Sequence, residues 1–233
     1  MKRMFLFAVL AGIATGTVGC KQQDAPNLDK QTVRLYVGDQ VRLTADRPVT
    51  WSAADDFYAA VDGEGNVTAR HVGTTTVTAT NDSGSAACTV TVQPRYDTFI
   101  EPLYDCLSLH PLSVLKEAET REILKENDKE IVYKGVAPLE KISYSIVWQD
   151  ETPFVLNAVA YISSVAYLDE CIAFMDERYE RRDEGEQGED AIWAFYYDNT
   201  GNLLAYIAYT YATAPYLWIV YPAIAENIPT LNK

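Results

Sequence analysis

Histidine, methionine and cysteine are scarce in this chain of 233 residues, which contains two, three and four of them respectively. The two histidines, His71 and His110, stand in no motif that would make either of them a general base. A cysteine nucleophile would need His110 beside Cys106 or Cys171, yet no nucleophile-elbow, zinc or cysteine-protease motif accompanies these residues. The chain also lacks a G-x-G-x-x-G sequence and a P-loop. We therefore expect no enzyme, no metal site and no cofactor.

Positive charge is scarce as well, since 19 Lys and Arg residues stand against 33 Asp and Glu, which gives a net charge of −14. Contacts to phosphate dominate the affinity of proteins for nucleic acid, so this balance argues against DNA or RNA as a partner. It also disfavours electrostatic binding to anionic lipid and leaves an acyl chain as the expected membrane contact. A chain this acidic has many carboxylates that could pair as in glycosidases, but nothing in the sequence selects a pair.

No apolar run reaches the roughly 20 residues that a membrane-spanning helix needs. The longest extends from Met4 to Val18 and follows the positive residues Lys2 and Arg3. Small residues then lead to a cleavage site before Cys20. This order is typical of a secretory signal peptide, which we place at residues 1–19.

The end of this leader reads Thr17-Val18-Gly19-Cys20 and resembles the lipobox of bacterial lipoproteins. The resemblance implies that Cys20 becomes the lipidated first residue of the mature chain, although a plain signal peptide with a coincidental cysteine is the alternative. Residues 20–27 are polar and are expected to form a flexible lipidated tether. Localisation would then be the cell envelope, on the outer membrane or the cell surface.

Residues 28–93 consist of short alternating strands separated by turns. Val33, Leu35 and Val37 alternate with polar residues, and the segment Asp62–Asn66 is rich in residues that tolerate positive φ. Such spacing predicts a small β-sandwich in which Trp51 fills the core between the sheets; a ligand-stacking role for Trp51 is the alternative. In the last strand, Cys88 is expected to be a small buried residue.

The order of these blocks resembles the bacterial Ig-like group 2 family almost throughout residues 28–93. The blocks that carry the resemblance are Leu35–Asp39, Thr50–Ser52, Val61–Ala69, Val72–Ala79 and Cys88–Val92. The resemblance implies an all-β Ig-like sandwich that serves as a spacer or adhesion unit.

Residues 95–233 are expected to form a second domain, an α+β two-layer domain with helices on one face of an antiparallel sheet. Expected helices are two short ones within Tyr96–Lys125, broken at Pro111, and one at Ser163–Arg182. Expected strands are Glu130–Tyr133, Lys141–Trp148, Phe154–Ile162, Ala191–Tyr197, Leu203–Thr213 and Tyr216–Tyr221. The acidic run Asp183–Asp190 lacks the spacing of a calcium-binding hand and is expected to be a solvated loop.

Two pairs of similar segments within the second domain raise the question of an internal duplication. Residues 104–107 are similar to residues 169–172, and the expected hairpin 146–161 is similar to residues 195–209. Duplication of a unit of helix and hairpin is one interpretation; chance similarity within an ordinary α+β domain is the other.

The last three strands carry aromatic residues on both faces, and two or three helices cover only one face. We predict that Trp193, Tyr197, Tyr206 and Trp218 form a surface for a ligand or partner, because these side chains bury a large area and keep a polar tip in water. Burial of all four by helices and loops is the alternative. Cys106 and Cys171 are expected to be either buried thiols or a disulfide.

These features favour a lipid-anchored envelope protein whose Ig-like spacer presents a C-terminal binding or assembly domain. The membrane, through the N-terminal lipid, and a protein or glycan ligand are the expected partners. A small extracytoplasmic hydrolase or inhibitor on the same stalk is the alternative function.

Overall fold

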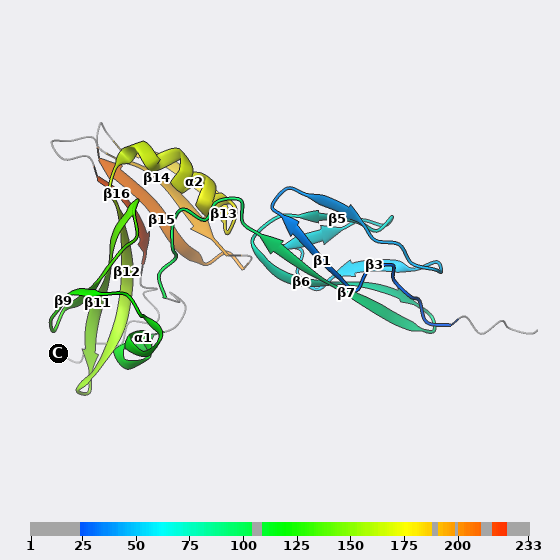
Figure 1. The fold of residues 1–233 in the computed structure, drawn as a ribbon, viewed down its shortest axis with the longest axis horizontal. Coiled ribbons are helices and arrows are strands. Elements are labelled where there is room, and N and C mark those ends of the chain that lie inside the picture. Colours follow the sequence, from blue (N-terminus) through cyan, green and yellow to red (C-terminus); the bar gives the residue numbers. More distant parts are fainter. Residues whose placement is uncertain (1–23, 104–108, 188–190, 199, 211–215, 223–233) are drawn as a thin grey trace, which may run out of the picture.

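The computed structural model describes residues 24–103, 109–187, 191–198, 200–210 and 216–222. Two β-rich domains follow one another along this part of the chain, and a short linker after residue 93 joins them (Figure 1). The predicted signal peptide, Cys20 and the first part of the predicted tether lie outside the described residues.

The first domain is a sandwich of two sheets, as the sequence predicts. One sheet has the strand order β1-β7-β6-β3 and the other has the order β2-β5-β4. Strand β1 pairs with β7 in parallel, and the other pairs are antiparallel. The strands are β1 (Thr32–Tyr36), β2 (Gln40–Arg42), β3 (Thr50–Ala53), β4 (Ala59–Val61), β5 (Asn66–Ala69), β6 (Gly73–Asn81) and β7 (Gly84–Gln93).

Apolar residues from both sheets form the core of this sandwich. Leu43, Val67, Val77, Cys88 and Val90 are at most 1% exposed and belong to one cluster, which confirms the predicted burial of Cys88.

Trp51 is less buried than its predicted position at the centre of the core requires. It packs against the core cluster but is only partly buried. The reason is that Trp51 lies in β3, the edge strand of the four-stranded sheet, where no further strand covers its outer side.

The tether is shorter than the sequence predicts, because residues 24–27 are attached to the sandwich. Pro26 is buried, and the side-chain amide of Asn81 donates to the carbonyl oxygen of Asp24 at 3.0 Å. The backbone N–H of Asn27 donates to Oδ1 of Asp46 at 2.8 Å. These bonds hold the segment that precedes Leu28 against the domain.

The second domain is built on one antiparallel sheet with the strand order β13-β14-β15-β16-β12-β11-β10-β9; the short strand β8 also pairs with β12. Its elements are β8 (His110–Pro111), α1 (Leu112–Ala118), β9 (Ile123–Glu126), β10 (Glu130–Lys134), β11 (Leu139–Gln149), β12 (Thr152–Ile162), a 3-10 turn (Val165–Tyr167), α2 (Leu168–Asp176), β13 (Glu180–Gln187), β14 (Ala191–Tyr197), β15 (Leu203–Thr210) and β16 (Tyr216–Tyr221).

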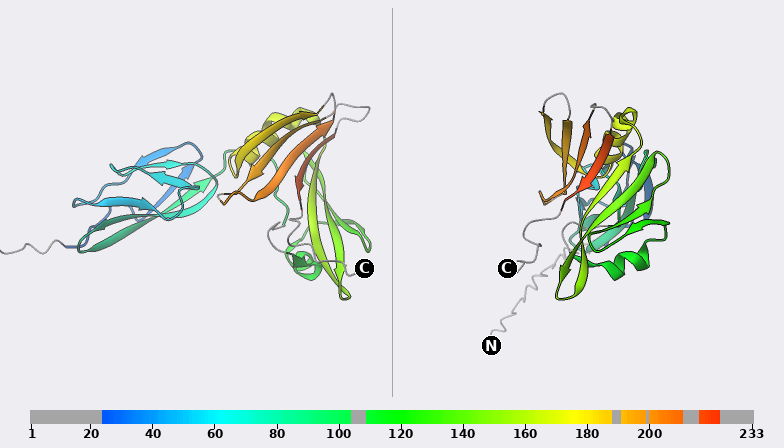
Figure 2. Two further views of the ribbon diagram at one scale, coloured as in Figure 1. Left: turned by 180° about the vertical axis from the view of Figure 1, so that it is seen from behind. Right: turned by 90° about the vertical axis from the view of Figure 1, so that its left-hand side faces the viewer.

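The two halves of this domain have the same order of elements. Helix α1 is followed by the four strands β9–β12, helix α2 is followed by β13–β16, and the last strands of the halves, β12 and β16, pair at the middle of the sheet. Figure 2 shows the strands of the first half, in green, meeting those of the second half, in gold to red. The similar segments found in the sequence pair β11–β12 with β14–β15. The order of elements instead pairs β11–β12 with β15–β16. The sequence similarity is therefore offset by one strand from the structural correspondence.

One face of the sheet packs against the helices and forms the core. Phe99, Leu115, Phe174, Met175 and the inward residues of β10–β12 and β14–β16 belong to a single buried cluster. Because α1 and α2 have only seven and nine residues, the domain is mostly β, and the predicted α+β class is not confirmed. The predicted antiparallel sheet is present.

The helix expected before Pro111 does not form within residues 95–103, which are irregular. Side-chain groups satisfy the backbone of this segment in place of helical bonds. For example, the N–H of Leu103 donates to the hydroxyl of Tyr144 at 3.0 Å. Burial raises the pKa of Tyr144 to about 12. After Pro111, α1 begins as predicted.

The helix expected over Ser163–Arg182 ends much earlier, at Asp176. Most of the acidic run that we expected to be a loop belongs to strand β13, from Glu180 to Gln187. Strand β13 pairs with β14 on one side and lies at the edge of the sheet, so its charged side chains remain compatible with a strand.

The turn between β4 and β5 gives a test of the first domain. Gly65 has φ +84°, and a Cβ placed there would lie 2.5 Å from the carbonyl oxygen of Leu43. We expect Gly65→Ala to lower the free energy of unfolding of this domain by about 1–3 kcal/mol, because the substitution adds backbone strain to a clash. Gly63→Ala is the matched control, because a Cβ at Gly63 meets nothing within 4 Å. Equal melting temperatures of the two variants would contradict this expectation.

Candidate functional site

The face of the second sheet that points away from the core carries half-buried aromatic residues. Along β15 and β16, buried residues such as Ile207 and Ile219 alternate with half-buried ones. The half-buried aromatic residues are Tyr161, Phe195, Tyr197, Tyr206 and Trp218. We call this surface the outer aromatic face.

The strand register places several of these residues in a row that crosses the sheet. Lys141 of β11 is opposite Tyr161 of β12, and Tyr161 is opposite Trp218 of β16. Trp218 is opposite Ala208 of β15, and Ala208 is opposite Trp193 of β14. The Nζ atom of Lys141 lies 4.6 Å from the centre of the Tyr161 ring. The structure describes the backbone of Trp193 and not its side chain.

A second row runs beside the first. Val159, Val220, Tyr206 and Phe195 occupy consecutive opposed positions on β12, β16, β15 and β14. The rings of Tyr206 and Phe195 have centroids 5.9 Å apart. These two rows lie next to each other on the outer face.

Tyr197 lies at the end of β14, apart from the two rows. The guanidinium of Arg182 lies 5.3 Å from the centre of the Tyr197 ring and forms an ion pair of 2.7 Å with Glu180. The bulge between Arg181 and Asp183 in strand β13 occurs at Arg182.

Of the four predicted site residues, Trp193 and Trp218 thus share a row, Tyr206 belongs to the neighbouring row, and Tyr197 lies at the margin. Tyr197, Tyr206 and Trp218 are each half-buried. Helices and loops therefore do not fully bury these three side chains, contrary to the alternative interpretation of the sequence. Sequence reasoning missed Tyr161 and Lys141. The alternation of β11 and β12 contains both residues, but the pairing of β12 with β16 joins positions that are far apart in the chain.

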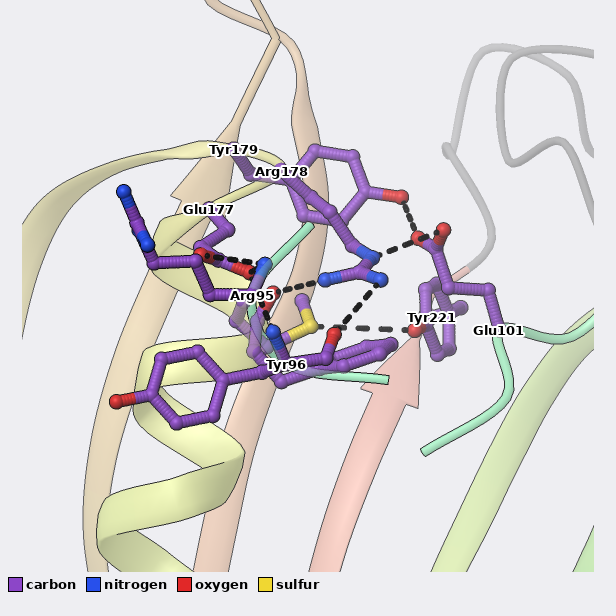
Figure 3. A network of polar contacts seen from close by, with 9 residues as sticks. Arg95, Tyr96, Glu101, Glu177, Arg178, Tyr179 and Tyr221 are labelled. Atoms are coloured by element: carbon purple, nitrogen blue, oxygen red, sulfur yellow. Dashed lines mark hydrogen bonds and ion pairs between the residues drawn. The ribbon is translucent and has the colours of Figure 1, made fainter. Parts of the chain in front are cut away.

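A second cluster of polar groups joins the two domains (Figure 3). Glu177, just after α2, is 6% exposed. Its carboxylate accepts the backbone N–H groups of Arg95, at 2.8 and 3.0 Å, and of Tyr96, at 2.9 Å. Its backbone carbonyl accepts the N–H of Val72 in the first domain at 2.7 Å. One residue therefore binds both the linker and the Ig-like domain.

Arg178 extends this junction toward the segment that follows the linker. Its guanidinium donates to the carbonyl oxygens of Phe174, at 2.8 Å, and Tyr96, at 3.2 Å, and pairs with Glu101 at 3.4 Å. The hydroxyl of Tyr179 also donates to Glu101. Figure 3 shows these side chains converging on the linker from the end of α2.

Arg95 fastens the linker to the first domain as well. Its Nε donates to the carbonyl oxygen of Val37 at 3.0 Å, and its guanidinium pairs with Asp39 and lies 5.4 Å from the centre of the Tyr36 ring. Hydrogen bonds therefore reach the linker from both domains.

His71 and Cys171 are two further candidate residues, and each contacts or is buried by neighbouring groups of the fold. The ring of His71 stacks on Phe57, with centroids 4.0 Å apart, and its Nδ1 lies 2.7 Å from the Phe57 carbonyl oxygen. Cys171 is a buried, free thiol, and burial raises its pKa. Cys106 lies outside the described residues, so both expectations for it, a buried thiol or a disulfide with Cys171, stay predictions.

Across the described ranges, no three or more His, Cys, Asp or Glu residues gather in a way that could hold a metal ion. Within those same residues, no helix is both long enough and apolar enough to cross a membrane.

Residues 21–92 match the family model described as "Bacterial Ig-like domain (group 2)". The match confirms the predicted resemblance for the first domain. An uncharacterized protein of Clostridium acetobutylicum is 39% identical over 79 residues. That alignment covers 29% of this chain and 8% of the relative, so this chain spans a small part of the relative's length.

Two solved structures show a weaker likeness. A crystal structure of human protocadherin-24 EC1-2 is 13% identical, covers 58% of this chain and 83% of its own, and has a TM-score of 0.25. The titin Ig tandem domains A164-A165 are 9% identical, cover 85% of this chain and 82% of their own, and have a TM-score of 0.26. At TM-scores this low, neither likeness bears on the fold or the function of this protein.

The junction generates a prediction about domain orientation. Glu177→Gln places an amide N–H₂ group against backbone N–H donors and removes one acceptor oxygen, at a cost of about 1–3 kcal/mol. We expect small-angle X-ray scattering of the variant to show a broader range of interdomain distances than the wild type shows. Asp169→Asn, the same chemical change on the exposed side of α2, is the control and should scatter like the wild type. If Glu177→Gln also scatters like the wild type, the junction does not depend on this carboxylate.

Burial also predicts low reactivity for Cys88 and Cys171, because the fold raises the pKa of both thiols. Thiolate is the reactive form, so neither thiol should react with a maleimide at neutral pH before unfolding. Mass spectrometry of a Cys20→Ala, Cys106→Ser variant checks this, with the same protein in denaturant as the control. Rapid labelling of Cys171 in the folded variant would show that its site is open.

Proposed function

We propose that this protein is a lipid-anchored protein of the cell envelope, placed on the outer membrane or the cell surface. In this proposal the Ig-like domain is a spacer that presents the second domain for binding or assembly. The observation that carries it is the junction at Glu177, where a buried carboxylate and its own backbone carbonyl bind the linker and the first domain together. A spacer controls the orientation of what it presents only if such a joint is stiff.

The short tether supports the same function. Asp24 is already bonded to the sandwich, so the chain from Cys20 to Asp24 spans at most about 14 Å. An acyl chain on Cys20 would therefore hold the Ig-like domain close to the membrane surface. The second domain would then be held outward by the length of the sandwich, which it follows in Figure 1.

The outer aromatic face supports binding as the role of the second domain. Tyr and Trp side chains are enriched where a surface meets a partner, since they combine a large apolar area with a polar group. The function assigned here involves no catalytic step, no cofactor and no nucleic acid.

Lipid attachment is tested by mass spectrometry of protein expressed in a bacterial host with its own leader. We expect a mature chain that begins at Cys20 and carries a diacyl or triacyl group. Cys20→Ala should abolish attachment without unfolding either domain, because the residue precedes the first segment bonded to the sandwich. Circular dichroism of this variant is the control for folding. Soluble wild-type protein cut at another position would refute the anchor.

A further inference from the structure

The first and last strands of the Ig-like domain lie side by side and run in the same direction. Strand β1 pairs in parallel with β7, from Thr32 opposite Thr89 to Tyr36 opposite Gln93. The other strand pairs of this sandwich are antiparallel. A parallel pair is slightly less stable per residue than an antiparallel pair, so equilibrium stability alone does not favour this arrangement.

The parallel pair determines how the domain meets a pulling force. A load held before β1 pulls that strand toward its own start, and a load held after β7 pulls β7 toward its own end. The two strands are then drawn past each other along their length. The hydrogen bonds of a parallel ladder are evenly spaced, so they share this load and have to break together. An antiparallel pair at the two ends of a domain would instead open one bond at a time.

The path of the chain allows a load to follow this direction. Figure 1 shows that the described chain enters the sandwich at one end and leaves it for the second domain at the other end. The ladder also continues past both ends of β1. The N–H of Thr89 donates to the carbonyl oxygen of Gln31 at 2.9 Å, and the N–H of Val37 donates to the carbonyl oxygen of Gln93 at 3.2 Å.

Arg95 fastens the end of this pair at which the second domain is attached. It follows β7 in the chain, and its side chain reaches the end of β1. Its Nε donates to the carbonyl oxygen of Val37 at 3.0 Å, and its guanidinium pairs with Asp39 and lies 5.4 Å from the centre of the Tyr36 ring. Sliding of β1 along β7 would stretch these contacts together with the ladder, whereas peeling from the start of β1 would reach them last.

We propose that the Ig-like domain bears tension between the membrane anchor and the partner of the second domain. Strands β1 and β7 and the side chain of Arg95 form the clamp that carries this load. The inference deepens the proposed function, on which it rests, because an anchored protein is pulled whenever its partner moves relative to the membrane. Forced unfolding is governed by the rate of unfolding rather than by equilibrium stability, so the direction of the terminal strands is the feature that such a function requires.

The experiment holds single molecules at constant force in optical tweezers and measures the time until β1 leaves β7. It uses the chain from Cys20 to the C-terminus, expressed without its leader, so that the free thiol of Cys20 carries one handle. Cys106→Ser removes a competing thiol, and the other two cysteines are buried. The second handle is attached through Asp97→Cys, at an exposed residue close behind Arg95, and loads the pair along its length.

The matched control keeps the same bonds and changes only the direction of the pull. Its second handle is attached through Asp82→Cys, in the turn before β7. This turn lies at the end of the sandwich where the described chain begins, since the side-chain amide of Asn81 donates to the carbonyl oxygen of Asp24 at 3.0 Å. Force between Cys20 and residue 82 therefore peels β1 from β7.

We expect β1 to stay in place about tenfold longer or more under the lengthwise pull than under peeling at equal force. The reason is that hydrogen bonds which break together add their free energies in one barrier, whereas bonds which break in turn do not.

Arg95→Gln tests the side-chain part of the clamp. The variant should leave β7 about threefold faster under the lengthwise pull, because it loses the ion pair with Asp39 and the contact with the Tyr36 ring. Its lifetime under peeling should equal that of the parent. Arg34→Gln, the same change at an exposed residue of β1, is the control and should behave like the parent in both directions. Unchanged melting temperatures show that both variants are folded.

Equal lifetimes in the two directions would overturn the load-bearing function. An unchanged lengthwise lifetime in Arg95→Gln would remove this side chain from the clamp. Failure of the proposed function is measured separately, by the absence of lipid on Cys20 in the wild type. If the lipid is present and the two lifetimes are equal, the anchor and the spacer stand and the load-bearing function is wrong.

Discussion

The antiparallel pairing of β12 with β16 joins the two halves of the second domain, and both faces of its sheet depend on it. Ala158 and Ala160 of β12 are opposite Tyr221 and Ile219 of β16, and all four are buried. Small residues on one strand thus leave room for large ones on the other. A slip of one residue would expose this set to water and turn the outer residues into the core, so packing maintains the register. The same register brings together the outer residues of the two strands.

The position of Glu177 couples this domain to the Ig-like domain. A carboxylate that is removed from water is costly unless hydrogen-bond donors surround it. Here the donors are backbone N–H groups of Arg95 and Tyr96, so the linker satisfies the charge and the charge orders the linker. If the domains moved apart, the carboxylate would lose its partners and the N–H of Val72 would lose its acceptor. We therefore expect a stiff junction, because leaving buried polar groups unpaired is costly.

The alternation of apolar and polar residues along a strand could be recognised in the sequence wherever one face of that strand is buried. Strands β10, β11, β12, β14, β15 and β16 appear where the pattern predicts them, and so does the Ig-like sandwich. Strand β13 could not be recognised, because an edge strand with charged side chains needs no apolar alternation. Trp51 was placed too deep for a related reason: a sequence does not show which strand of a sheet is the edge.

The sequence by itself determined the turns, the alternation within each strand and the blocks typical of an Ig-like domain, because these depend on neighbours within a few residues. It also identified the aromatic strands from which a binding face could be built. Only the tertiary structure decided that Lys141, Tyr161 and Trp218 share a row and that Glu177 holds the linker. Register between strands distant in the chain is set by the packing of the whole core, and a buried carboxylate finds its donors only once both domains have folded.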